Sequence, residues 1–415
     1  MSSKCNECAH PCNSLRPFCP RWRFSRVAGA ECSCRRPHSR RLRRQHRSKA
    51  MNQLAHLPAI AIVAIAQTVP RPRAAATRWV RARPVPLALL GNGCRAARAH
   101  GPATVPPCGV HRLFEAHAAH NPAAIAIRTD DGNWTYGRLN AAANALARRL
   151  RRHGVRPGDT VATVLERSAR LVAAALAIVK CGATHVPLDP AAPLSWQAHV
   201  LADSGASAVL ADAIRLPGLA AGPVALAING ARRTDADGNL RVEAPVGTPA
   251  CLLYPAANSG KLLGHGLPHA TLARLAARNG YADFGAADCV AFAGGSPADV
   301  AGLELWGPLL AGGSLAILPE GVDDQGLAVA LHRHGVTVLF IATPRFDACA
   351  CTIPATLADL RVLLPVGPRP EMASFHAVLD RETEVDIRHC YGASAALACA
   401  LAHRVRRAHD TRQYN

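Results

Sequence analysis

The stretch Val179-Lys180-Cys181-Gly182-Ala183-Thr184-His185-Val186-Pro187-Leu188-Asp189-Pro190 decides how this chain folds. An apolar helix over 168–181 ends in Lys-x-Gly-Ala and runs directly into an apolar segment at 184–187, which Pro-Leu-Asp-Pro closes. A short apolar run bounded by turn residues is typical of a buried strand. The stretch therefore predicts a helix that passes directly into a buried strand.

Apolar strands and helices alternate on both sides of this stretch. Before it, the sequence predicts a first helix with a buried face of Leu113, Phe114, Ala116 and Ala118, a strand at 124–127, a helix at 139–153 and a strand at 160–165. After it, strands are expected at 207–210, 223–228, 250–254, 288–293, 313–318, 336–342, 360–366 and 385–390, and helices at 194–204, 269–279, 300–312 and 325–334. Strands separated by helices of about 10–15 residues favour βαβ units. We therefore expect an α/β fold with mainly parallel sheets flanked by helices.

A second motif, WTYGRLNAAANALARRL at 134–150, joins the first in pointing to one family. Together they make the chain resemble the adenylation domains of nonribosomal peptide synthetases, within the adenylate-forming superfamily of AMP-dependent synthetases and ligases. The resemblance covers about residues 85–407. It implies the fold of the large N-terminal subdomain and ATP-dependent activation of an amino acid to aminoacyl-AMP. The family's C-terminal subdomain, with its catalytic lysine, is expected to be absent because the chain ends at Asn415.

The positive charge is concentrated in the first quarter of the chain. Residues 1–100 carry 20 Lys and Arg against two acidic residues, which leaves +2 of the formal net charge of +20 for residues 101–415. We expect a disordered, basic, Cys-rich head at 1–84 because it offers few groups to offset the entropy of ordering. The resemblance further implies a linker at 85–109 like that between condensation and adenylation domains, a truncated AMP-binding adenylation domain at 110–407 and an unrelated tail at 408–415.

Several other classes of protein are disfavoured. The head has one Cys-x2-Cys pair, at Cys5 and Cys8, but no second pair at zinc-finger spacing, so no metal site is expected. Its arginines are interleaved with few aromatic residues, which argues against nucleic-acid binding. The apolar run Leu57 to Val69 is shorter than the roughly 20 residues that span a bilayer. No membrane partner and a cytoplasmic location follow.

The resemblance places the phosphate-binding loop at 254–264, YPAANSGKLLG, where the family has YTSGSTGxPKG. The positions expected to hold the phosphates of ATP or AMP are Ser259, Gly260, Lys261 and Gly264. Leu263 stands where the family has its lysine. Two interpretations stay open: Lys261 supplies the missing charge, or the segment is an ordinary connection that holds no phosphate.

The adenine and magnesium motif, Asn-x-Tyr-Gly-Pro-Thr-Glu in the family, corresponds to HCYGASA at 389–395. The resemblance implies that Tyr391 stacks on adenine, that Gly392 lets the backbone approach the nucleotide closely and that Ser394 offers a hydroxyl to the α-phosphate. Ala395 replaces the glutamate that acts as a Mg²⁺ ligand. ATP or AMP binding is therefore expected to be weak, the Mg²⁺ site lacks its anchor, and no catalytic residue is assigned.

The amino acid substrate would meet an apolar wall. Asp299 aligns with the family's aspartate that holds the substrate ammonium, although an aspartate before a helix also serves as an N-cap. The other aligned positions are Val300, Leu303, Leu364, Val366, Cys390, Ala398 and Cys399. This lining predicts a medium aliphatic or aromatic amino acid. The segment near Ile341 carries an apparent one-residue shift and is left unassigned.

These replacements lead us to expect amino acid activation that is impaired or lost. The alternative is a non-catalytic remnant that binds a nucleotide or a partner. A carrier protein, or a separate chain that supplies the C-terminal subdomain, is a possible partner in either case.

Overall fold

A computed structural model of the chain describes residues 109–215, 223–228, 238–244, 247–254, 264–276, 283–293, 301–381, 383–390 and 402–405. All of them belong to Pro72–Asn415, one of the two units into which the chain divides. The predicted head at 1–84, the linker up to residue 108 and the tail at 408–415 lie outside the described residues.

The larger sheet has eight strands in the order β14-β13-β12-β11-β9-β10-β1-β2. Its neighbours are parallel except at the two edges, where β13 pairs with β14 and β1 with β2 in antiparallel fashion. The bounds are β1 Ile125–Arg128, β2 Trp134–Thr135, β9 Cys289–Phe292, β10 Ser314–Ile317, β11 Val338–Ala342, β12 Val362–Val366, β13 Asp386–Cys390 and β14 Ala402–Val405.

The smaller sheet has six strands in the order β6-β5-β3-β4-β7-β8, and only β7 and β8 pair antiparallel. Its bounds are β3 Thr160–Val164, β4 Thr184–Leu188, β5 Ala208–Ala211, β6 Val224–Ala227, β7 Pro249–Leu253 and β8 His265–Pro268. The predicted fold class, α/β with mainly parallel sheets, is confirmed.

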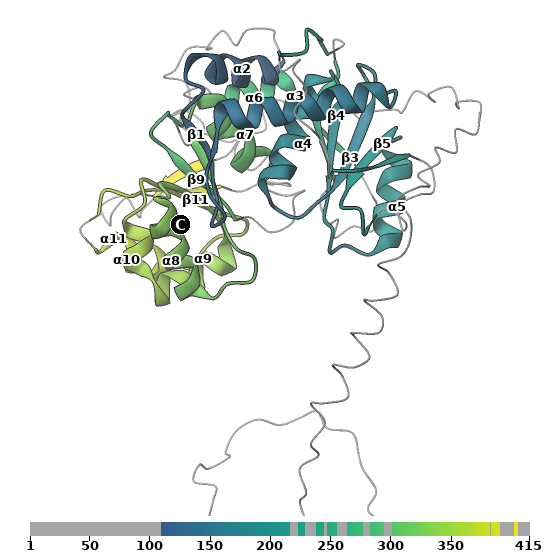
Figure 1. Ribbon diagram of the computed structural model, residues 1–415. Helices are drawn as coiled ribbons and strands as arrows, with labels where there is room; N and C mark the ends of the chain where they lie inside the picture. Colours follow the sequence, from purple (N-terminus) through teal and green to yellow (C-terminus); the bar gives the residue numbers. More distant parts are fainter. Residues whose placement is uncertain are drawn as a thin grey trace, which may run out of the picture. The chain divides into compact units, whose positions relative to one another are not determined.

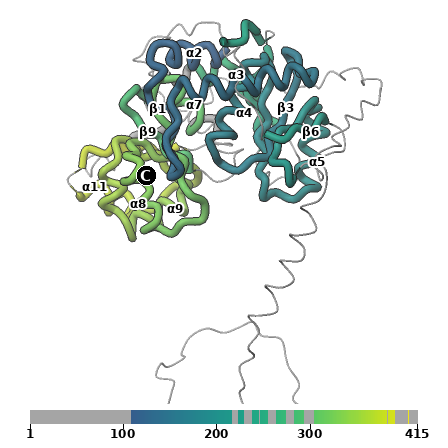
Figure 2. Tube along the Cα trace, in the orientation of Figure 1, coloured from purple at the N-terminus to yellow at the C-terminus, as the bar shows by residue number. Residues whose placement is uncertain are grey.

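Helices cover the sheets in layers. Their bounds are α2 Val110–His120, α3 Tyr136–Arg152, α4 Ala169–Lys180, α5 Leu194–Asp203, α6 His269–Ala276, α7 Ala301–Ala311, α8 Asp324–His334, α9 Thr343–Thr352, α10 Pro354–Ala358 and α11 Met372–Leu379. Helices α8 to α11 pack on one face of the larger sheet, where Figure 1 shows them grouped, and α5 packs on the outer face of the smaller sheet. A central core of α2, α3, α4, α6 and α7 contacts both sheets, and the trace in Figure 2 follows α4 between them.

The Lys-x-Gly-Ala motif is a helix cap. Gly182 has φ +70, and its N–H donates to the Val179 carbonyl at 3.0 Å while the Ala183 N–H donates to the Ile178 carbonyl at 3.2 Å. This pair of bonds is the Schellman motif, in which a left-handed glycine closes the last turn. Ile178 and Ala183, the two positions that make the apolar contact of this motif, are both fully buried in one apolar cluster. The cap sends the chain directly into β4, whose residues are all buried.

Lys180 is fully buried at the end of α4 and forms an ion pair with Glu115 of α2. Its ammonium also lies 3.3 Å from Asn239 Oδ1, which accepts from the side-chain amides of Asn140 at 2.9 Å and Asn144 at 3.1 Å. Asn239 belongs to residues 238–244, a segment that we call the strap. This polar cluster therefore ties α2, α3, α4 and the strap together.

The same ion pair corrects the predicted face of α2. Ala116 is exposed, whereas Glu115 is buried and turns toward Lys180. Apolar periodicity assigned the buried position to alanine, but a buried ammonium requires a counter-charge. The carboxylate therefore takes the inward position.

The other corrections concern short elements. No strand or helix was predicted at β8, α9, α10, α11 or β14, each of which the structure contains. α10 has only five residues, and α9 begins Thr-Pro-Arg with few apolar residues. Such segments carry no clear period, and they become helical here because they pack on the large sheet. No helix among the described residues is long and apolar enough to span a membrane.

Candidate active site

Strands β9, β11, β12 and β13 are parallel, so their C-terminal ends lie at one edge of the larger sheet. Ligands of open α/β sheets bind outside the carboxyl ends of such strands. Three predicted wall residues, Leu364 and Val366 of β12 and Cys390 of β13, are found here. Val366 pairs in register with Cys390, and alternate residues of a strand share a face. The structure therefore brings these three residues onto one face at that edge.

The face is apolar. Leu364 and Cys390 have no exposed surface and Val366 is half-buried. Phe340 of β11 pairs in register with Leu364, and its ring lies 6.5 Å from that of Phe284. The apolar cluster consists of Phe284, Val290, Val338, Phe340, Val362, Leu364 and Cys390, with Ala311 and Val366 against it. An aliphatic or aromatic group at the strand ends would therefore extend this cluster.

Phe340 was missed by the sequence analysis, which considered the segment near Ile341 without assigning it. Ile341 belongs to the cluster on the opposite face, which includes residues of α8 to α11, so of these two neighbours Phe340 lies on the candidate face. Residues 338–342 are all apolar because both faces of this sheet are covered. Only the register with Leu364 shows which of the two neighbours belongs to the site.

The turn after β12 borders this face and is held by hydrogen bonds from the segments on both sides of it. Thr343 Oγ1 donates to the Pro368 carbonyl at 2.8 Å, and His389 Nε2 lies 3.0 Å from the Gly367 carbonyl and 3.2 Å from that of Pro368. Since carbonyls only accept, Nε2 carries the proton. Gly367 itself has φ +128, which favours glycine. His389, which stands where the resembled motif has asparagine, thus holds the turn beside Val366.

Strands β7 and β8 flank the predicted phosphate loop. Tyr254, directly after β7, is buried and donates from its hydroxyl to Asp203 Oδ2 at 2.7 Å. Burial raises the pKa of Tyr254, and the bond to Asp203 raises it further. A Cβ on Gly264 would lie 2.8 Å from the Tyr254 ring. The structure therefore gives Gly264 a packing role at the end of the loop, and its predicted contact with phosphate stays a prediction.

The remaining predicted positions cannot be placed. Leu303 lies in the first turn of α7, where only the backbone is described. The others lie outside the described residues: Ser259, Gly260, Lys261, Leu263, Asp299, Val300, Tyr391, Gly392, Ser394, Ala395, Ala398 and Cys399. Within the described residues, no group of three or more His, Cys, Asp or Glu could hold a metal ion.

The comparison with protein families now decides the identity of this fold. A sequence model described as AMP-binding enzyme matches residues 114–415, well over half of the chain. The chain belongs to the AMP-binding enzyme family. Its predicted resemblance to the adenylation domains of nonribosomal peptide synthetases is confirmed.

Two relatives of this chain are much longer proteins. The chain is 36% identical over 306 residues to Malpibaldin synthetase of Mortierella alpina, covering 71% of this chain and 5% of that protein. It is 34% identical over 264 residues to a probable non-canonical nonribosomal peptide synthetase, CymA of Salinispora arenicola, covering 61% of this chain and 3% of that protein. The chain thus spans a small fraction of the relatives that it matches.

A solved structure supports the fold of this family member. The N-terminal subdomain of Klebsiella oxytoca NpsA, in complex with 3-hydroxyanthranilyl-AMSN, superposes with a TM-score of 0.62 at 24% identity. The match covers 69% of this chain and 72% of that chain. The described residues therefore have the fold of the N-terminal subdomain of the adenylate-forming enzymes.

Proposed function

We propose that this chain is an amino-acid-adenylating domain of the nonribosomal peptide synthetase type, which keeps an apolar amino acid site but has impaired or lost turnover. The observation that carries the proposal is the apolar face of Phe340, Leu364, Val366 and Cys390 at the C-terminal edge of the parallel strands. A buried apolar face at this edge suits the side chain of an amino acid.

The family reaction requires more than this face. A carboxylate oxygen of the amino acid attacks the α-phosphorus of ATP, a P–O bond forms, and the bond to pyrophosphate breaks. Charge develops on the phosphoryl oxygens, and fixed donors and cations stabilise it. Leu263 and Ala395 have no charge to offer at the positions where the family has lysine and glutamate. An alanine cannot ligate Mg²⁺, so the residues present do not fit the expected metal site.

The described wall supports a proposal for the substrate class. Phe340 is 2% exposed and Leu364 0%, and both belong to the apolar cluster on which the half-buried Val366 packs. We propose a medium aliphatic or aromatic amino acid, whose ammonium pairs with Asp299. If Asp299 is only an N-cap of α7, free amino acids will bind no better than their deaminated analogues.

Pyrophosphate exchange with the full chain, across all proteinogenic amino acids, tests turnover. We expect no exchange above background. ATP binding should be millimolar at best and equal with and without Mg²⁺, because stacking on Tyr391 alone contributes about 1–3 kcal/mol. Micromolar, Mg²⁺-dependent binding or clear exchange would overturn the proposed impairment.

Amino acid binding tests the retained site separately. Isothermal titration should detect leucine or phenylalanine but not aspartate, and Val366→Asp, at the half-buried position of the same face, should abolish the signal. Leu194→Asp, a change of the same charge at an exposed position of α5, serves as the control. Equal binding by the two variants would exclude the apolar face as the site.

A further inference from the structure

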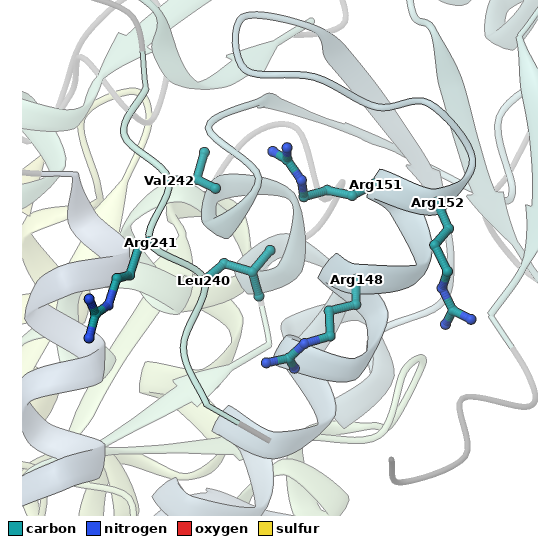
Figure 3. Close-up of a pocket in the computed structure, with 6 residues that line it drawn as sticks. All are labelled: Arg148, Arg151, Arg152, Leu240, Arg241 and Val242. Atoms are coloured by element: carbon teal, nitrogen blue, oxygen red, sulfur yellow. The ribbon is translucent and has the colours of Figure 1, made fainter. Parts of the chain in front are cut away.

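A cavity remote in sequence from the candidate site lies between the C-terminal half of α3 and the strap. It has a volume of about 480 Å³ and is lined by Arg148, Arg151, Arg152, Leu240, Arg241 and Val242. We call these six residues the arginine surface. Figure 3 shows three arginines on the helix and the other three residues on the facing strap. The lining thus combines four guanidinium groups with two aliphatic side chains and has no acidic member.

Little in the described part of the chain neutralises these charges. Arg148 donates to the Gly238 carbonyl, yet its Nη1 is buried and finds no hydrogen-bond partner among the described residues. Arg148 stands three and four residues before Arg151 and Arg152, so the three share a face of α3, and like charges at these spacings repel. No acidic residue occurs in α3.

The nearby acidic group of the strap is already engaged. Glu243 accepts from Arg112 Nη2 at 2.8 Å and from its Nε at 3.2 Å, on the side of α2. The positive charge of the arginine surface also reaches its buried neighbours. Arg148 lowers the pKa of Lys180, although burial is the larger cause, and Arg151 lowers that of Cys181 against the stronger effect of burial, which raises it. An anionic partner would relieve this positive field.

The arrangement of the guanidinium groups selects the kind of anion. In Figure 3, Arg148 and Arg151 extend from α3 toward the strap, whereas Arg152 and Arg241 lie on opposite outer sides of the six labelled residues. The four groups do not converge on one point, as they would around a single phosphate. The aliphatic side chains of Leu240 and Val242 lie between the charged groups. This pattern fits an extended ligand with carboxylates and aliphatic side chains in alternation.

We propose that the arginine surface is a docking site for an acidic, aliphatic-containing segment of a partner protein. A single-stranded nucleic acid is the other extended polyanion. It is disfavoured because its bases require aromatic platforms, and the lining contains no aromatic residue. The site is independent of the proposed adenylation reaction.

Fluorescence anisotropy with the full chain tests the proposal. The probe is a labelled peptide of alternating glutamate and leucine, about 12 residues long and roughly 40 Å when extended. Arg151→Glu combined with Arg241→Glu reverses two charges of the surface. Arg170→Glu combined with Arg381→Glu makes the same change in net charge at exposed positions that do not line the cavity. Far-ultraviolet circular dichroism and thermal unfolding establish that both variants are folded.

We expect the surface variant to bind the peptide at least about fivefold more weakly than the control variant, because each reversal replaces an attraction with a repulsion. Replacing leucine by serine in the peptide should also weaken binding to the wild-type chain. A single-stranded oligonucleotide of equal charge should not distinguish the two variants. Equal peptide affinities of both variants would overturn the proposal, and so would a larger loss of oligonucleotide binding than of peptide binding.

Discussion

Replacing Lys180 by methionine tests the account of the Lys-x-Gly-Ala motif. Methionine keeps the buried apolar stem but removes the ammonium that pairs with Glu115. Lys180 is fully buried and Glu115 is 6% exposed, so the carboxylate would lose one of its two cationic partners in a dry environment. Removing one member of a buried ion pair costs about 3–5 kcal/mol of unfolding free energy. Arg112 stays 3.1 Å from the other carboxylate oxygen, so we expect about 3 kcal/mol, at the low end.

For Glu115→Gln, the change of the other member of the pair, the loss of unfolding free energy that arises through Lys180 has an upper bound. Burial already lowers the pKa of Lys180 to about 8, against the raising effect of Glu115. In Glu115→Gln the pKa should fall further, and Lys180 will be neutral in the fold at pH 7. Because the pKa of Lys180 is already about 8 in the wild-type fold, complete loss of its proton at pH 7 costs at most about 1.4 kcal/mol more than in the wild type, which bounds what this variant loses through deprotonation of Lys180.

Urea unfolding of the full chain at pH 7 measures both losses. The double variant Lys180→Met, Glu115→Gln removes both charges, so its loss should be at least about 2 kcal/mol smaller than the sum of the two single losses. The slope of free energy against urea should stay constant across the four proteins. Losses that add within about 0.5 kcal/mol would show that the two residues do not interact, and the reasoning would fail.

Three further changes give separate tests. Gly264→Ala should destabilise the fold by about 1–3 kcal/mol, because the added Cβ would lie 2.8 Å from the Tyr254 ring. Gly266→Ala, whose Cβ would make no contact below 3.4 Å, should be near neutral. Equal melting temperatures of the two variants would contradict this prediction. Burial lowers the pKa of His111 to about 4. In the unfolded state this histidine has a pKa near 6.5, so as the pH falls the unfolded state binds the proton first, and up to about 3 kcal/mol of unfolding free energy should be lost between pH 6.5 and 4. His111→Leu should remove this part of the pH dependence. An unchanged profile of unfolding free energy against pH in this variant would refute the prediction. Phe340→Ala should cost about 3–5 kcal/mol in unfolding free energy and should favour larger amino acids in calorimetric titration, while an unchanged preference would remove Phe340 from the proposed pocket.

Much of the fold could be predicted from local sequence. The helix over Ala169–Lys180 and the strand over Thr184–Leu188 were expected within a residue or two of their observed ends. Their signals are local: an apolar helix, a glycine that permits φ +70, and an apolar run that Pro190 follows. These features act over a few residues, so the chain needs no distant partner to display them.

Part of the candidate site could also be predicted. Leu364, Val366 and Cys390 were assigned through a resemblance to a family, and the structure places them on one face. The choice between Phe340 and Ile341 was beyond the sequence, because a strand covered on both faces has no apolar alternation to reveal its orientation. The register with β12 decided it.

Tertiary structure alone decided the polar contacts that hold distant segments together. Glu115 turns inward in place of Ala116 because Lys180, distant in sequence, is buried beside it. Asn239 joins this pair only because the strap crosses α3 and α4. A buried charge is stable only with a partner, and that partner is chosen by position in space. Periodicity reports which side of a helix is apolar, whereas the meeting of two charges depends on how the helices pack.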